Sequence, residues 1–135
     1  MADNIPTITT LHNLLDADAS RFISSEIKLK KSLTVWVNVA SSVKLKAVLQ
    51  KYLDFVQQHV EKMNAFFEEE KISSLSVSSR VMDAFIEETN EKLLNCTDAE
   101  VKDACLLASI QAINHFKIST YGTAAAFANA LSMEK

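Results

Sequence analysis

The chain has 135 residues, of which 48% are hydrophobic, and it contains one glycine and one proline. This length suits a single domain with a substantial core. The scarcity of turn residues excludes sandwich and α/β folds, so the composition predicts an all-α fold. The formal net charge is −3, with lysines and arginines scattered among acids. Because no basic face is formed, nucleic-acid binding is not expected.

The amino terminus shows no targeting pattern. Residues 1–10 are polar and include Pro6, so we treat them as a lead-in to a single helical domain over residues 11–135. No basic region precedes an apolar run, and no segment has the composition of a membrane span. Cys96 and Cys105 lack a metal-binding or redox spacing and are predicted to be reduced thiols. We expect a cytoplasmic protein with no membrane partner.

The first predicted helix covers about residues 11–40. Its apolar positions recur at alternating steps of three and four, as expected of a helix with one buried face. A carboxylate interrupts this face, and a buried carboxylate requires a cation, a metal or several hydrogen-bond donors. The face consists of Leu15, Ala19, Phe22, Glu26, Leu29, Leu33, Trp36 and Ala40.

The second predicted helix covers about residues 43–69 and follows a short turn, Ala40-Ser41-Ser42, which offers a hydroxyl for the helix N-cap. Because the connection is short, the first two helices should pack antiparallel. His59 lies on the apolar face of this helix. Two interpretations of it are open: a hydrogen-bonded core histidine or a metal ligand. The face is formed by Leu45, Leu49, Tyr52, Val56, His59, Met63 and Phe66.

A serine-rich stretch after residue 69 is predicted to be a solvated linker. It leads to a shorter connector helix over about residues 79–94. Thr97 and Glu100 have the spacing of a capping box and predict that the last helix begins there.

The last predicted helix covers about residues 98–131 and is apolar over much of its circumference, which places it inside a bundle. A lysine stands where the pattern requires an apolar side chain. The apolar face contains Leu106, Ile110, Ile113, Lys117, Tyr121, Ala124, Phe127 and Leu131.

Three segments resemble a known family. Residues 103–123 read Asp-Ala-Cys-Leu-Leu-Ala-Ser-Ile-Gln-Ala-Ile-Asn-His-Phe-Lys-Ile-Ser-Thr-Tyr-Gly-Thr, and residues 25–33 and 45–59 add weaker matches. Together they resemble the ferritin-like YciE/YciF family of bacterial stress-associated proteins over about residues 11–131. The resemblance implies an antiparallel ferritin-like helix bundle with a cluster of carboxylates and imidazoles that holds two metal ions.

The chain departs from the family pattern at most of the implied metal ligands. Glu26 falls on the acid of the first helix, and His115 falls on the histidine of the last helix. An alternative register places Asp18 on the first acid, but Glu26 requires no gap. The other four ligand positions are occupied by Tyr52, Phe55, Asn114 and Lys117.

Two readings of this site follow. In the first, Glu26 and Lys117 face each other and form a buried ion pair where relatives hold metal, so that no metal or other cofactor binds; both side chains could instead reach the surface. In the second, a reduced site retains iron for storage or for ferroxidase-like oxidation. Its ligands would be Glu26, His59 and His115, with Asp18 or Asp54 as further candidates.

The resemblance also implies a fourth long helix after the Tyr-Gly-Thr segment, where this sequence stops at Lys135. An apolar groove along the first, second and last helices would then require cover. We therefore predict a homodimer or higher homo-oligomer, with the third helix lending cover. The favoured function is that of a non-catalytic structural or interaction protein with a degenerate metal site.

Overall fold

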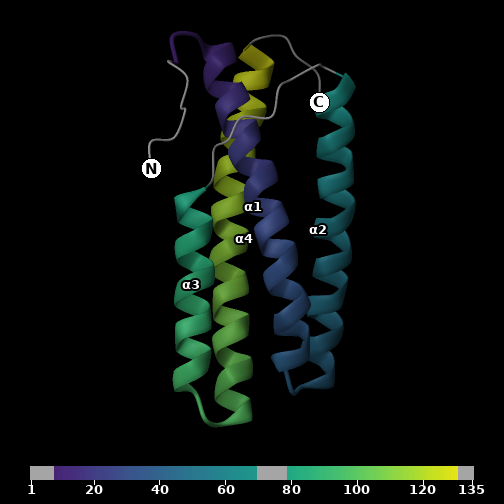
Figure 1. Cartoon of the computed structure of the whole chain (residues 1–135), viewed down its shortest axis with the longest axis vertical. Helices are drawn as coiled ribbons and strands as arrows, with labels where there is room; N and C mark the ends of the chain where they lie inside the picture. The colour runs from purple at the N-terminus through teal and green to yellow at the C-terminus, as the bar shows by residue number, and fades with distance from the viewer. Residues whose placement is uncertain (1–7, 70–78, 131–135) are drawn as a thin grey trace.

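The computed structural model describes residues 8–69 and 79–130, which form four helices. They are α1 (Leu11–Val39), α2 (Val43–Glu69), α3 (Arg80–Asn95) and α4 (Ala99–Ala130). Figure 1 shows them aligned along one long axis, with short turns joining α1 to α2 and α3 to α4 at the same end. The predicted all-α antiparallel bundle is confirmed. The lead-in before residue 8, the predicted linker at 70–78 and Leu131 lie outside the described residues.

Helix α1 is the centre of the arrangement. It packs against each of the other three helices, whereas α2 packs mainly on α1 and α3 packs on α1 and α4. Figure 1 shows α2 on one side of α1, with α3 and α4 on the other side. The third helix, expected as a connector, also contributes to the core, because Met82 is fully buried. No helix in the described part of the chain is long and apolar enough to cross a membrane.

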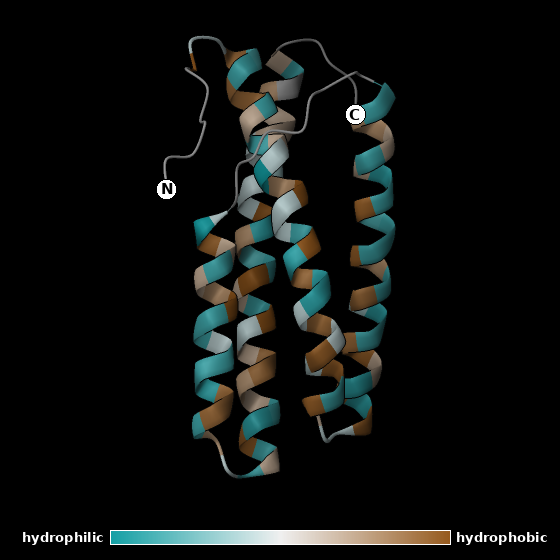
Figure 2. Ribbon diagram, viewed as in Figure 1, coloured by the Kyte–Doolittle hydropathy of each residue, from teal (hydrophilic) through white to brown (hydrophobic). Residues whose placement is uncertain are grey.

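The core follows the predicted faces. Apolar and polar segments alternate along each helix in Figure 2, as expected of amphipathic helices. Trp36 is 1% exposed and donates its indole N–H to Asn90 Oδ1 at 2.9 Å, so its one polar atom has a partner. The principal buried cluster contains Leu29, Leu33, Trp36, Ala40, Leu49, Val56, Val60, Met82, Leu106, Ile110 and Ile113.

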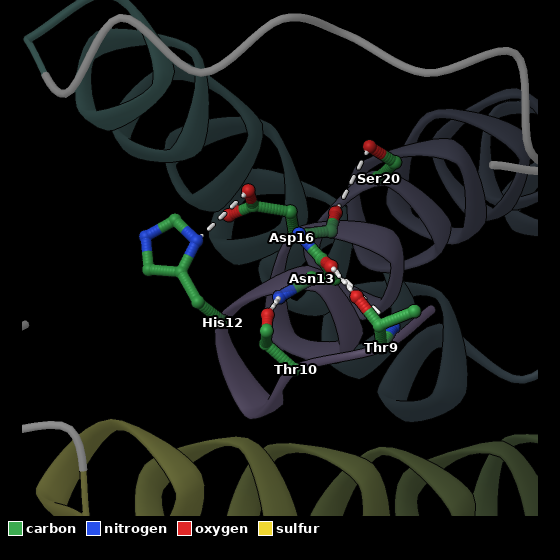
Figure 3. A network of polar contacts seen from close by, with 6 residues as sticks. All are labelled: Thr9, Thr10, His12, Asn13, Asp16 and Ser20. Carbon is green, nitrogen blue, oxygen red and sulfur yellow. Dashed lines mark hydrogen bonds and ion pairs between the residues drawn. The ribbon is translucent and has the colours of Figure 1, made fainter. Parts of the chain in front are cut away.

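Side chains fix the start of α1. Thr10 is the N-cap, and its hydroxyl accepts the Asn13 backbone N–H at 3.0 Å. The Asn13 side chain in turn accepts a hydrogen bond from the Thr9 hydroxyl at 3.2 Å, and His12 lies 3.3 Å from Asp16 (Figure 3). The Thr10 cap satisfies a backbone donor that the first turn leaves unpaired, and the other two contacts join side chains across that turn.

The turn between α1 and α2 is held by an aspartate from α4. Ser42 caps α2 by accepting the Leu45 N–H at 3.3 Å, which confirms the expected hydroxyl cap. Asp103 accepts the backbone N–H groups of Ser41 and Ser42 at 2.8 and 2.9 Å, and the Ser41 hydroxyl at 2.8 Å. These hydrogen bonds, chiefly the one from the Ser41 backbone, lower the pKa of Asp103.

The predicted cap of the last helix is wrong by one residue. The Asp98 carboxylate, and not Thr97, accepts the Val101 N–H at 3.2 Å, and α4 begins at Ala99. Aspartate and threonine are both good N-cap residues, and the structure uses Asp98.

Candidate functional site

The candidate site is built around Glu26, near the middle of α1. Its position on the apolar face of α1 turns its side chain into the bundle, where it is 0% exposed. Its neighbours come from the two helices that flank α1 on this face. Lys117 of α4 and His59 of α2 both reach the carboxylate.

Each oxygen of this carboxylate has its own neighbour. Lys117 Nζ lies 3.0 Å from Glu26 Oε1, and the lysine side chain is 15% exposed. His59 Nδ1 lies 2.7 Å from Glu26 Oε2, and the imidazole is 39% exposed. The three side chains therefore link α1, α2 and α4, and the contact reaches the molecular surface through His59.

The hydrogen bonding of Glu26 is incomplete. Although Lys117 is its ion-pair partner, Glu26 Oε1 is buried and receives no hydrogen bond from the described residues. Leaving a buried acceptor without a donor costs free energy, and more so when the acceptor is charged. The Lys117 ammonium, 3.0 Å away, is therefore the group that compensates the charge at this buried oxygen.

Both tyrosines of the chain lie beside the ion pair. Lys117 donates to the Tyr52 hydroxyl at 3.3 Å and lies 5.0 Å from the centre of that ring and 6.0 Å from the Tyr121 ring. Tyr121 packs edge-on against His59, with ring centres 5.2 Å apart. Burial raises the pKa of both phenols, and the negative charge of Glu26 raises it further. Both phenols are therefore held neutral.

A cavity of about 240 Å³ adjoins the carboxylate. Most of its wall comes from α2, and Phe55 stands in that wall although 61% of its surface is exposed. The lining residues are Glu26, Phe55, Val56, Gln58, His59, Lys62 and Lys117. The cavity is therefore a mixed site, with an apolar side and a group of cationic and amide side chains.

The other implied metal ligands are not brought to this cluster. His115 is exposed on α4 and does not line the cavity, and Asn114 is half-buried without lining it. Asp54 accepts a hydrogen bond from Gln50 at 3.1 Å on the surface of α2. Asp18 pairs with its own helix neighbour Arg21 at 3.5 Å.

These residues do not fit a di-metal centre. Within residues 8–69 and 79–130, no three histidine, cysteine, aspartate or glutamate side chains are grouped closely enough to hold a metal ion. A lysine ammonium also stands at Glu26, the one buried carboxylate among the described residues. An ammonium and a divalent cation repel each other, so this donor set is unsuited to a metal at Glu26.

Some features of the site could not be read from the sequence. The periodicity identified Glu26 and Lys117 as polar residues on apolar faces, and it placed His59 on the face of α2 that turns inward. It gave no sign that His59 would share the carboxylate with Lys117. Tyr52 and His59 are seven residues apart on one face of α2, and this spacing was the available signal that both would turn toward the same neighbouring helices, two helical turns apart.

Comparison with known proteins identifies the family. The family described as "Domain of unknown function (DUF892)" matches residues 10–135. Protein YciF of Escherichia coli (strain K12) is 30% identical over 115 residues, which cover 83% of this chain and 68% of YciF.

Two solved structures share the fold. YcfI of Rhodopseudomonas palustris, provisionally described as a structural protein, matches with a TM-score of 0.89 at 25% identity, over 99% of this chain and 83% of YcfI. The crystal structure of the Escherichia coli stress protein YciF matches with a TM-score of 0.85 at 28% identity, over 93% of this chain and 79% of that one. The chain therefore belongs to the DUF892 family and is a YciF-like protein.

Proposed function

We propose that this chain is a non-catalytic, structural member of its family in which an ion pair takes the place of a metal centre. The observation that carries the proposal is the distance of 3.0 Å between Lys117 Nζ and Glu26 Oε1. A fixed ammonium supplies the positive charge that a buried carboxylate requires. The description of YcfI as a structural protein and of YciF as a stress protein agrees with such a role.

The geometry also argues against catalysis at this cluster. Its two phenols are held neutral by burial and by the charge of Glu26, so neither is poised to act as a base or a nucleophile near neutral pH. The carboxylate is fully buried and already paired with a cation. The arrangement stabilises a fold better than it transfers protons.

The metal content of untagged protein tests this proposal. The protein is exposed to ferrous iron without oxygen, loose metal is removed, and bound metal is measured per chain. Iron well below one equivalent supports an ion pair in place of metal. One or two equivalents that disappear in Glu26→Ala would overturn the proposal in favour of iron storage or oxidation.

We further propose that the protein acts as a homodimer through the open face between α2 and α4. Phe55 lies between Tyr52 and His59 on α2, and both of these side chains reach α4 residues. On α4, the ring of Phe116 packs against Phe85 of α3. Ile118 follows two residues later and therefore lies on the opposite flank of α4, away from α3.

Both apolar side chains at this face are exposed, Phe55 by 61% and Ile118 by 68%. Val48 and Leu107 add 57% and 48% exposed side chains on the same two helices. Exposed apolar surface of this kind is typical of an interface. A second copy of the chain would cover the apolar surface that α2 and α4 leave exposed.

A further inference from the structure

The two cysteines of the chain lie at the end of the bundle where α3 turns into α4. Cys96 is the C-cap of α3, and its backbone N–H donates to the Lys92 carbonyl at 3.1 Å. Cys105 lies in the second turn of α4, which begins at Ala99. Both are free thiols, and each residue is partly exposed. A small molecule in solvent can therefore reach this part of the contact between the two helices.

A hydrogen bond between α3 and α4 shows which faces of the two helices meet. The hydroxyl groups of Thr89 and Ser109 are 2.8 Å apart, and Thr89 is 2% exposed. Cys96 follows Thr89 by seven residues, and Cys105 precedes Ser109 by four, so each cysteine lies on the same helix face as its hydroxyl neighbour. Because α3 and α4 are antiparallel, both steps lead toward the turn. The two thiols therefore face the same contact.

Helix geometry brings the two thiols together along the bundle axis. At about 1.5 Å per residue, Cys96 lies about 4.5 Å closer to the turn than Cys105. A Cα–Cβ bond tilts toward the N-terminus of its own helix, which is away from the turn for Cys96 and toward the turn for Cys105. The two thiols lie within hydrogen-bonding reach of each other. Burial raises the pKa of Cys105, and the neighbouring Cys96 raises it further.

We propose that Cys96 and Cys105 form a redox modification site, in which hydrogen peroxide converts the two thiols into a disulfide. One thiolate attacks the peroxide and the O–O bond breaks, which gives a sulfenic acid and one water. The other sulfur attacks the sulfenic sulfur, the S–O bond breaks, and a second water leaves. Two thiols and one peroxide thus give one disulfide and two waters, and two electrons pass from sulfur to oxygen.

The disulfide ties the end of α3 to α4 where the turns of the bundle meet. Figure 1 shows the α1–α2 turn and the α3–α4 turn at the same end of the molecule. Asp103, two residues before Cys105, already holds the α1–α2 turn through the backbones of Ser41 and Ser42. The new bond closes a loop of about ten residues and so restricts the unfolded chain. The oxidised protein is therefore expected to be more stable than the reduced protein.

Peptide mapping of the full chain tests whether the bond forms. Trypsin cuts after Lys92, Lys102 and Lys117, so the two cysteines fall in separate peptides, 93–102 and 103–117. After treatment with hydrogen peroxide and blocking of the remaining thiols, we expect these peptides to be joined within a monomeric chain. The mass of the joined peptide should be about 2 Da below the sum of the two, for the two hydrogens lost. Dithiothreitol should separate the peptides.

Thermal unfolding followed by circular dichroism tests whether the bond fits the fold. The oxidised parent should melt at a higher temperature than the reduced parent. Cys96→Ser is the matched control, because it keeps the shape of the side chain but cannot form the bond, so peroxide should not raise its melting temperature. Cys105→Ser should behave in the same way. Methionine oxidation affects the parent and both controls alike, so the comparison isolates the disulfide.

Three results would overturn the proposal. Peroxide could leave the two peptides separate, with the thiols still free or oxidised to sulfinic acid. It could join two chains through an intermolecular disulfide. The linked chain could also be no more stable than the reduced chain, which would mean that the bond strains the fold. Because neither cysteine lies in the Glu26 cluster, the outcome is independent of the iron test above.

Discussion

Lys117 Nζ lies 3.0 Å from Glu26 Oε1 and 3.3 Å from the Tyr52 hydroxyl, so one ammonium group joins α1, α2 and α4. Helix α2 packs mainly on α1, which makes this contact one of the few polar links from α2 toward α4 among the described residues. The ion pair is therefore expected to contribute both to the stability of the bundle and to the position of α2.

The two partners should show strong coupling in a double-mutant cycle. Lys117→Met leaves Glu26 as an uncompensated buried charge and should lower the free energy of unfolding by about 3–5 kcal/mol. Glu26→Leu combined with Lys117→Met should be close to the parent, because neither charge remains. Urea unfolding followed by the fluorescence of Trp36, the one tryptophan, measures the cycle. His115→Ala at the exposed surface is the control, and single mutants as stable as the parent would contradict a buried pair.

The two tyrosines should lose their hydroxyl protons only at a pH above the usual range for tyrosine. The pKa of Tyr52 and of Tyr121 is raised above the ordinary 10.0, first by burial and then by the charge of Glu26. The folded state thus holds these protons more tightly than the unfolded state, so stability is retained below pH 10 and falls as the pH rises above it.

The change in absorbance at 295 nm on raising the pH reports the phenolates of both residues, since the chain has only these two tyrosines. We expect little phenolate in the folded protein at pH 10 to 11 and a steep rise on unfolding. Glu26→Gln should shift the onset to lower pH. A normal titration in the folded parent would show that neither phenol is buried beside a negative charge.

Asp103 should stabilise the protein only while it is ionised. Hydrogen bonds from the Ser41 and Ser42 backbones lower its pKa below the ordinary 3.8, so its contribution is present above pH 3.8 and is lost as the pH falls through the folded value. Asp103→Asn should therefore lower the melting temperature at pH 7 and have a smaller effect near pH 2. Thermal unfolding followed by circular dichroism at the two pH values checks this. An equal loss at both would mean that the charge of Asp103 has no role.

A single charge introduced into the proposed dimer interface should dissociate the dimer. Phe55→Glu places a carboxylate in the centre of the open face between α2 and α4 and should convert a dimer into a monomer at micromolar concentration. Leu94→Glu is the matched control, because Leu94 is 86% exposed on α3 and away from this face. Sedimentation velocity measures both variants. A parent that sediments as a monomer would rule out the homodimer.

Much of the architecture could be predicted from local pattern. The four helices follow from apolar residues repeated every three or four positions, with few glycines and prolines to interrupt them. The start of the last helix was predicted one residue too early, because Thr97 and Asp98 are both residues that can cap a helix. Glu26 and Lys117 could also be identified from the sequence, because each is a charged residue on an otherwise apolar helix face. Burying a charge is costly, so a charged residue at such a position needs a partner.

The sequence by itself determined the helices, their inward faces and the residues that break those faces, since all of these depend on spacing along one segment. Only the tertiary structure decided which side chains meet. That His59 shares the Glu26 carboxylate with Lys117, and that Asp103 holds a turn more than sixty residues away, depends on the rotation and offset of packed helices. Those are set by the whole core at once. The cavity beside Glu26 arises in the same way, because its lining residues come from α1, α2 and α4.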